Sequence, residues 1–114
     1  MSDRRHAGTA YVVTPPSGVG PGVLLLHSWW GLTPFFKGVA DRLADAGFVA
    51  LAPDLFGGRT AERPDEAEAL QAETDPNETA ALVLSSAGAL ARLPAVTGTD
   101  LGVVGFSMGG SWAL

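Results

Sequence analysis

The stretch LGVVGFSMGG, residues 101–110, decides the predicted fold of this 114-residue chain. It starts as a continuous apolar run, which is typical of a strand buried on both faces of a parallel sheet. Directly after that run, residues 105–109 read GFSMG and match G-x-S-x-G, a motif that forms a strained turn from a strand into a helix. We therefore predict that Ser107 is a nucleophile at the carboxyl end of the strand. The backbone N–H of Met108 is predicted to face the position where an oxyanion would form.

The glycines of this motif allow two other interpretations. The chain has 15 glycines, so a G-x-S-x-G sequence can also arise by chance and form an ordinary turn. A phosphate-binding loop is disfavoured, because Gly105, Gly109 and Gly110 do not follow G-x-G-x-x-G and no lysine comes after them. The position of the motif after a strand of the expected type favours the nucleophile over both alternatives.

Strand and helix patterns alternate on the amino-terminal side of the motif. Apolar runs at residues 23–27 and 48–51 predict two more buried strands, and a β-branched and aromatic segment at 9–14 predicts another. Helices are predicted between Pro34 and Gly47, over residues 64–73, and from Asp75-Pro76 to Leu93. Strands that alternate with helices indicate an α/β fold, a mostly parallel sheet with helices on both faces.

Length and composition limit the class of protein. Hydrophobic residues make up 46% of the chain and charged residues 17%, which excludes a disordered chain. We expect one domain over residues 9–114, after a flexible tail at residues 1–8. The chain has no cysteine, so a disulfide framework and a thiolate metal site are excluded, and we expect neither a metal nor a cofactor. The net charge of −5 argues against a nucleic-acid partner, and the longest apolar run, residues 23–26, is too short to span a membrane, so we expect a soluble cytoplasmic protein.

The segment HSWWGL, residues 27–32, lies at the end of the first predicted buried strand. Binding sites in parallel sheets gather beyond the carboxyl ends of the strands, so this loop can supply a second oxyanion donor through a backbone N–H. Trp29 and Trp30 either form the wall of an apolar pocket or pack under the loop as core. His27 is predicted to hold the loop by a hydrogen bond and not to act as the catalytic base.

Three segments in this order resemble the dienelactone hydrolase family of α/β-hydrolases: HSWWGLTP at 27–34, APDLF at 52–56 and GFSMGG at 105–110. The resemblance extends from about residue 9 to the end of the sequence. It implies the amino-terminal part of an α/β-hydrolase fold, ending just after the nucleophile turn. It also implies hydrolysis of a small-molecule ester or lactone through a nucleophile, an acid and a histidine.

Carried over residue by residue, the resemblance assigns the nucleophile to Ser107 and the oxyanion N–H groups to Met108 and Trp29. Ser28 and Trp30 are pocket candidates in the same loop. The sequence departs from typical members in two places, with Ser107 in place of cysteine and Ser28 in place of glutamate. The departures agree with each other, because a carboxylate that interacts with a thiol of pKa about 8.5 has no comparable role beside a hydroxyl. They indicate a serine-type member and argue against dienelactone itself as the substrate.

Other parts of the family's site have no match in the sequence. Arg59 and Arg63 follow the second buried strand, but neither matches the arginines that hold the substrate carboxylate in typical members. Residues 108–114 contain no Asp, Glu or His, and both histidines, His6 and His27, precede Ser107. We therefore expect the amino-terminal half of a longer serine hydrolase, inactive by itself.

Two other functions stay open at this point. The chain could be a complete, non-catalytic α/β domain that binds a partner through its open sheet edge or its tryptophan surface. Alternatively, a second chain could supply the acid and the histidine. The oligomeric state is left open.

Overall fold

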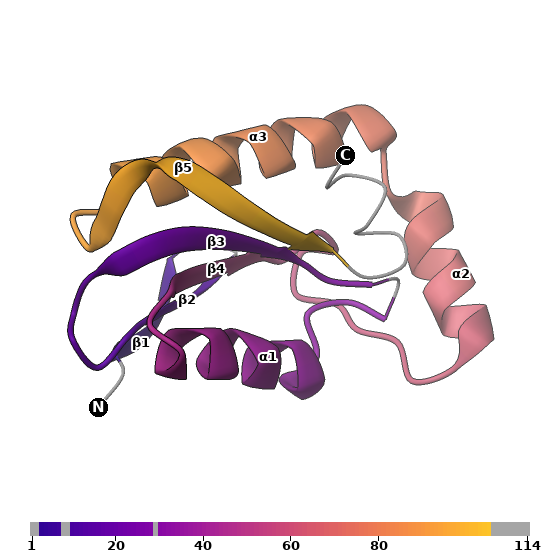
Figure 1. Ribbon diagram of the computed structural model, residues 1–114. Coiled ribbons are helices and arrows are strands. Elements are labelled where there is room, and N and C mark those ends of the chain that lie inside the picture. Colours follow the sequence, from indigo (N-terminus) through magenta and orange to yellow (C-terminus); the bar gives the residue numbers. More distant parts are fainter. Residues whose placement is uncertain (1–2, 8–9, 29, 106–114) are drawn as a thin grey trace.

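The computed structural model describes residues 3–7, 10–28 and 30–105. Five strands form one sheet, with helices packed on both of its faces (Figure 1). The strands are β1 (Asp3–Ala7), β2 (Ala10–Thr14), β3 (Gly20–Leu26), β4 (Val49–Pro53) and β5 (Val96–Gly105), and the helices are α1 (Pro34–Asp45), α2 (Pro64–Glu73) and α3 (Pro76–Arg92). The predicted α/β class is confirmed.

The strands of the sheet follow the order β1-β2-β4-β3-β5. β3 pairs in parallel with β4 on one side and with β5 on the other, whereas β2 is antiparallel to both β1 and β4. The sheet is therefore mixed, and its parallel part is the group of three strands centred on β3. β1 lies within the segment for which the sequence predicts a flexible tail. Its pairing with β2 uses backbone groups, and residues 3–7 carry no apolar run that would have indicated a strand.

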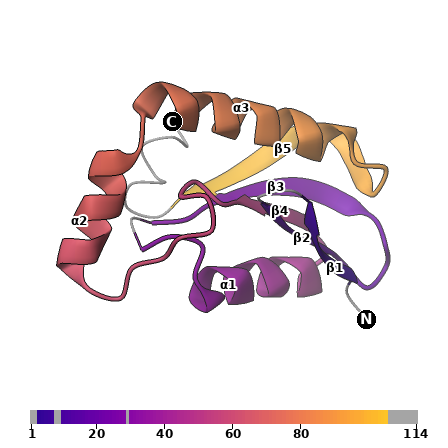
Figure 2. The ribbon, with the colours of Figure 1, turned by 180° about the vertical axis from the view of Figure 1, so that it is seen from behind.

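Alternate residues of β3 pack on opposite faces of the sheet. The helix α3 covers one face of the sheet and α1 the other (Figures 1 and 2). Leu24 and Leu26 join the cluster that includes Leu90 of α3, and Leu25 joins the cluster that includes Phe36 of α1. Both clusters are closed to solvent, because Leu24 is 2% exposed and Leu25 and Leu26 are 0% exposed. A strand covered on both faces needs no polar alternation, which explains the continuous apolar run in the sequence.

The helices begin and end close to the residues that the sequence predicts, and their first residues are capped differently. The side chain of Asp75 accepts a hydrogen bond of 2.9 Å from the backbone N–H of Asn77, as expected of a residue that precedes a helix. Thr33 precedes α1 in an extended conformation, but its side chain makes no capping bond. Gly47 follows α1 with a φ of 105° and donates its N–H to the carbonyl of Ala44, so a left-handed residue ends the helix.

β5 differs from the prediction of a strand buried on both faces. Val103 is 44% exposed and Val104 is 36% exposed. β5 pairs with β3 along one edge, and no other strand of the described residues pairs with it. The apolar run therefore predicted the strand correctly, but not its burial. None of the described helices is long and apolar enough to cross a membrane.

Candidate active site

The carboxyl ends of the three parallel strands meet at one edge of the sheet, opposite the amino-terminal ends (Figure 1). The loop at residues 27–33 follows β3, and the loop at 54–63 follows β4. Gly105, the last residue of β5 and the first of the G-x-S-x-G motif, is the register partner of Leu26, the last residue of β3. The motif therefore begins directly beside the loop that follows β3. Ligand sites in α/β sheets lie at this edge.

His27 connects the loops after β3 and β4. Its ring is fully buried and lies 5.2 Å from the ring of Phe56 and 6.4 Å from that of Phe36, between centroids. Nε2 accepts a hydrogen bond of 2.9 Å from the N–H of Leu55. Nδ1 must then carry the proton of the neutral ring and donate it to the carbonyl of Ser28 at 2.6 Å. The prediction that His27 holds this loop by a hydrogen bond is confirmed.

The environment of His27 keeps its ring neutral. Burial lowers the pKa of His27 below its ordinary value of 6.5, because the charged ring would lose its hydration. The hydrogen bond to the Ser28 carbonyl and the charge of Asp54 raise the pKa, but burial is the larger effect. A protonated ring could no longer accept from Leu55. Both ring nitrogens are thus occupied by the backbone, which leaves neither of them for proton transfer.

Backbone contacts shape the loop after His27. The N–H of Gly31 donates to the carbonyl of Ser28 at 3.1 Å, and the Trp30 N–H points to Ser28 Oγ at 3.4 Å. Gly31 has a φ of 92°, and a Cβ atom there would lie 2.6 Å from the carbonyl oxygen of Arg59. The turn therefore requires glycine. The Trp30 carbonyl accepts from the N–H of Ala61 at 2.9 Å, which joins this loop to the one after β4.

A cavity of about 710 Å³ opens beside this loop. It is lined by residues from the loop, from the start of α1 and from the loop after β4: Ser28, Trp30, Thr33, Phe35, Phe36, Ala61 and Glu62. Both pocket candidates, Ser28 and Trp30, line it. Trp30 also packs against the small cluster of Phe56, Ala61, Ala67 and Leu70, so the wall and core interpretations of this side chain both hold. The sequence did not predict the other lining residues, although Phe35, an aromatic residue directly after Pro34, was a usable signal.

Three of the predicted site residues, Trp29, Ser107 and Met108, lie outside the described residues. Their roles stay predictions. The comparison with known proteins identifies the family of the chain. The sequence model of the dienelactone hydrolase family matches residues 9–114. The chain belongs to the dienelactone hydrolase family.

Relatives in this family are longer than the printed chain. Protein usf from Aquifex pyrophilus is 37% identical over 110 residues, which cover 91% of this chain and 47% of that protein. Carboxymethylenebutenolidase from Rhodococcus opacus is 34% identical over 104 residues, covering 86% of this chain and 38% of that enzyme. The solved structure of m3DLH superposes with a TM-score of 0.73 at 26% identity, over 99% of this chain and 51% of the other. The chain thus spans about half the length of these three proteins, or less.

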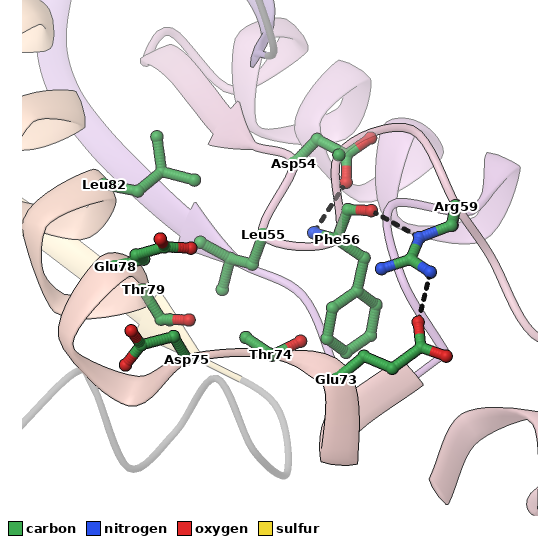
Figure 3. A pocket seen from close by; sticks show the side chains of 11 residues that line it. Asp54, Leu55, Phe56, Arg59, Glu73, Thr74, Asp75, Glu78, Thr79 and Leu82 are labelled. Atoms are coloured by element: carbon green, nitrogen blue, oxygen red, sulfur yellow. Dashed lines mark hydrogen bonds and ion pairs between the residues drawn. The ribbon is translucent and has the colours of Figure 1, made fainter. Parts of the chain in front are cut away.

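A second cavity, of about 270 Å³, lies between the loop after β4 and the junction of α2 and α3 (Figure 3). The Asp54 carboxylate accepts from the N–H groups of Phe56 at 3.0 Å and Gly58 at 2.8 Å, which closes a turn over this cavity. The guanidinium of Arg59 forms an ion pair with Glu73 on the cavity wall. The residues that line this second cavity are mainly acidic or apolar. Its chemical environment therefore differs from that of the cavity beside Ser28.

Neither arginine after β4 lines the cavity beside Ser28. Arg59 pairs with Glu73 in the second cavity, and Arg63 donates to Asp65 at 3.2 and 2.6 Å. This contact lowers the pKa of Asp65 and raises that of Arg63. Within the described part of the chain, no three His, Cys, Asp or Glu side chains lie close enough together to hold a metal ion.

Proposed function

We propose that this family member hydrolyses a carboxylic ester or lactone with Ser107 as the nucleophile. The observation that carries the proposal is the register of β5, in which Gly105 lies beside Leu26 and the G-x-S-x-G motif starts next to the His27 loop. Membership of a hydrolase family and the position of Gly105 and the His27 loop at the carboxyl ends of the parallel strands support the same function.

The proposed reaction needs a nucleophile and oxyanion donors, which this chain supplies, and a catalytic histidine, which it does not. Ser107 Oγ attacks the carbonyl carbon, and the N–H groups of Met108 and Trp29 donate to the oxyanion. A histidine takes the hydroxyl proton and gives it to the leaving alkoxide, and water then hydrolyses the acyl-enzyme. His27 does not fit that role, because the backbone occupies both of its nitrogens. We therefore propose that the printed 114 residues alone do not turn over substrate.

Ser28 supports a serine nucleophile in this proposal. It stands where typical family members have glutamate, and its side chain is 5% exposed beside a loop built from backbone contacts. A hydroxyl nucleophile of ordinary pKa gains nothing from a neighbouring carboxylate, and burying that carboxylate would cost free energy. The proposed substrate is a small molecule, and the proposed location is the cytoplasm.

Labelling with a fluorophosphonate probe, followed by peptide mass spectrometry, tests the nucleophile in a preparation that also supplies the acid and the histidine, because a serine needs an adjacent base to react with the probe. We expect the adduct on Ser107, no adduct in Ser107→Ala, and full labelling in Ser85→Ala, which removes an exposed serine of α3. The 114 residues alone should be labelled much more slowly and should hydrolyse 4-nitrophenyl acetate no faster than Ser107→Ala does, because no base activates Ser107 there. Labelling that survives Ser107→Ala would contradict the assignment.

The exposed side chains of β5 favour a second candidate function. In this alternative, the chain is a non-catalytic α/β domain that binds a partner along β5, the outer strand of the sheet. This candidate predicts a cooperatively folded chain with no labelled Ser107 and with Val103 and Val104 protected when the partner binds. The first proposal predicts labelling once the acid and the histidine are supplied, whether or not that edge is covered. The probe experiment therefore separates the two functions.

A further inference from the structure

Among the described residues, the lining of the cavity beside Ser28 is mainly apolar and has one charged side chain, which is negative. Its apolar lining residues are Trp30, Phe35, Phe36 and Ala61, and its charged one is Glu62. Phe35 is 61% exposed, so much of this large aromatic side chain faces solvent. Exposed aromatic side chains at a cavity commonly mark a binding surface.

The walls of this cavity are held in place by packing and hydrogen bonds. Phe36 is 5% exposed, and its ring meets that of Phe35 edge-on, with centroids 5.1 Å apart and planes at 83°. On the opposite side, the hydrogen bond between the Trp30 carbonyl and the Ala61 N–H joins the two loops. A flat apolar group can therefore bind without first ordering these side chains.

The nearby cations are engaged elsewhere. Arg59 pairs with Glu73, Arg63 pairs with Asp65, and Lys37 Nζ lies 5.6 Å from the centroid of the Tyr11 ring. A carboxylate in the cavity would lose hydration, meet no cation of the described lining, and be repelled by Glu62. The hydroxyls of Ser28 and Thr33 can instead donate to a neutral oxygen.

We infer that this cavity binds a neutral aryl or similarly flat apolar group of the substrate and rejects a group that carries a free carboxylate. The inference rests on the proposed function for the reacting ester. The recognition itself depends only on described residues of the β3 loop, the start of α1 and the loop after β4.

Two ketones that differ by one carboxylate test the selectivity without any hydrolysis. Acetophenone and 4-acetylbenzoate are titrated into the ¹⁵N-labelled chain and followed through the backbone amide signals. We expect acetophenone to bind at least about tenfold more tightly and to shift the signals of Thr33, Ala61 and Glu62. Equal affinities, tighter binding of 4-acetylbenzoate, or shifts confined to Leu55 and Thr79 in the second cavity would each overturn the inference.

Paired variants test the wall and the charge separately. Phe35→Ala should weaken acetophenone binding about fivefold, while Leu84→Ala, which truncates a 73% exposed side chain on α3, should not change it. Glu62→Lys should strengthen binding of 4-acetylbenzoate at least about fivefold, and Glu68→Lys, on the exposed part of α2, should have a much smaller effect. An unchanged affinity in Phe35→Ala or Glu62→Lys would contradict the assigned role of that residue.

Ser107→Ala separates this inference from the proposed function. The variant should bind acetophenone with unchanged affinity, because the ketone needs no nucleophile. If fluorophosphonate fails to label Ser107 while the ketone selectivity is found, the hydrolase proposal fails and the neutral aryl site stands. If labelling succeeds and the selectivity is absent, the nucleophile stands and the inferred substrate class is wrong.

Discussion

β3 and β5 are neighbouring parallel strands with similar apolar sequences, yet their burial differs sharply. Leu24 is 2% exposed, and its register partner Val103 is 44% exposed. β3 has a strand on each side and lies between the clusters under α1 and α3. β5 has a described strand on one side only and contacts α3. An apolar run thus indicates a strand, whereas its burial depends on the elements around it.

Truncating a leucine in each strand gives the largest expected contrast. Leu25→Ala should lower the free energy of unfolding by about 2–5 kcal/mol, because it opens a cavity in a fully buried cluster. Leu101→Ala, at a half-buried position of β5, should cost roughly 1–2 kcal/mol. Urea unfolding measures both. Equal losses would mean that neighbouring elements do not explain the difference between the strands.

Glycine-to-alanine substitutions compare how tightly β3 and β5 are packed where the two strands meet. A Cβ atom at Gly22 of β3 would lie 2.8 Å from Leu101 Cδ2 and 3.2 Å from Leu90 Cγ, so Gly22→Ala should destabilise the fold by roughly 1–3 kcal/mol. At Gly102 of β5 the nearest atom, Val23 Cγ2, is 3.5 Å away, an ordinary contact. Gly102→Ala should therefore leave the Tm unchanged or raise it. A larger loss in Gly102→Ala would contradict the packing described for this contact.

The free energy of unfolding should depend on pH through His27, the residue that follows β3. Its pKa is lowered in the folded chain, so the unfolded chain takes up a proton first as the pH falls below 6.5. The neutral ring contributes to the free energy of unfolding above pH 6.5, and this contribution is lost as the pH falls. The slope of the free energy of unfolding against pH should be at most about 1.4 kcal/mol per pH unit. Urea unfolding between pH 7.5 and about 5.5, above most carboxylate titrations, measures this slope.

Two histidine variants control for that slope. His27→Gln should abolish it in this pH range, because glutamine does not titrate there, and should lower the stability at pH 7.5, because an amide does not replace the ring that packs against Phe36 and Phe56. His6→Gln keeps His27 and should retain the slope. A slope that persists in His27→Gln would assign the pH dependence to another group.

Polar substitutions on the exposed side of β5 should have the smallest effect. Val103→Thr places a hydroxyl where water can reach it, so the free energy of unfolding should change by less than about 0.5 kcal/mol. Val23→Thr, on β3 at 6% exposure, buries the same hydroxyl and should cost roughly 1–3 kcal/mol. Similar values for the two would show that Val103 is covered in solution.

Local signals in the sequence predicted much of the fold. The run that contains Leu24, Leu25 and Leu26 predicted a two-sided strand, and Pro34, Asp75 and Gly47 predicted helix ends close to those observed. These signals are local because each depends on backbone angles or on the alternation of side chains within one element. The strand at Asp3–Ala7 was missed, since its pairing with β2 leaves no apolar pattern in the sequence.

The candidate site was predicted less completely than the fold. The order of the motifs identified the loop with Ser28 and Trp30 and the role of His27 in holding it. The contribution of Phe35, Ala61 and Glu62 to the same cavity was not predicted, because these residues come from different segments that meet only in the folded chain. The pairing of Arg59 with Glu73 was equally hidden, since the partners are 14 residues apart and belong to different elements.

The sequence by itself determined the family, the α/β class and the positions of the main strands and helices. Short-range spacing carries this information, because strand alternation and helix ends depend on neighbouring residues. Only the tertiary structure decided which β5 side chains are exposed beside a buried β3, which nitrogen of the His27 ring carries the proton, and that the described lining of the cavity beside Ser28 contains no cation. Burial, tautomer and local charge depend on which distant groups come together, and that is set by the packing of the whole sheet with its helices.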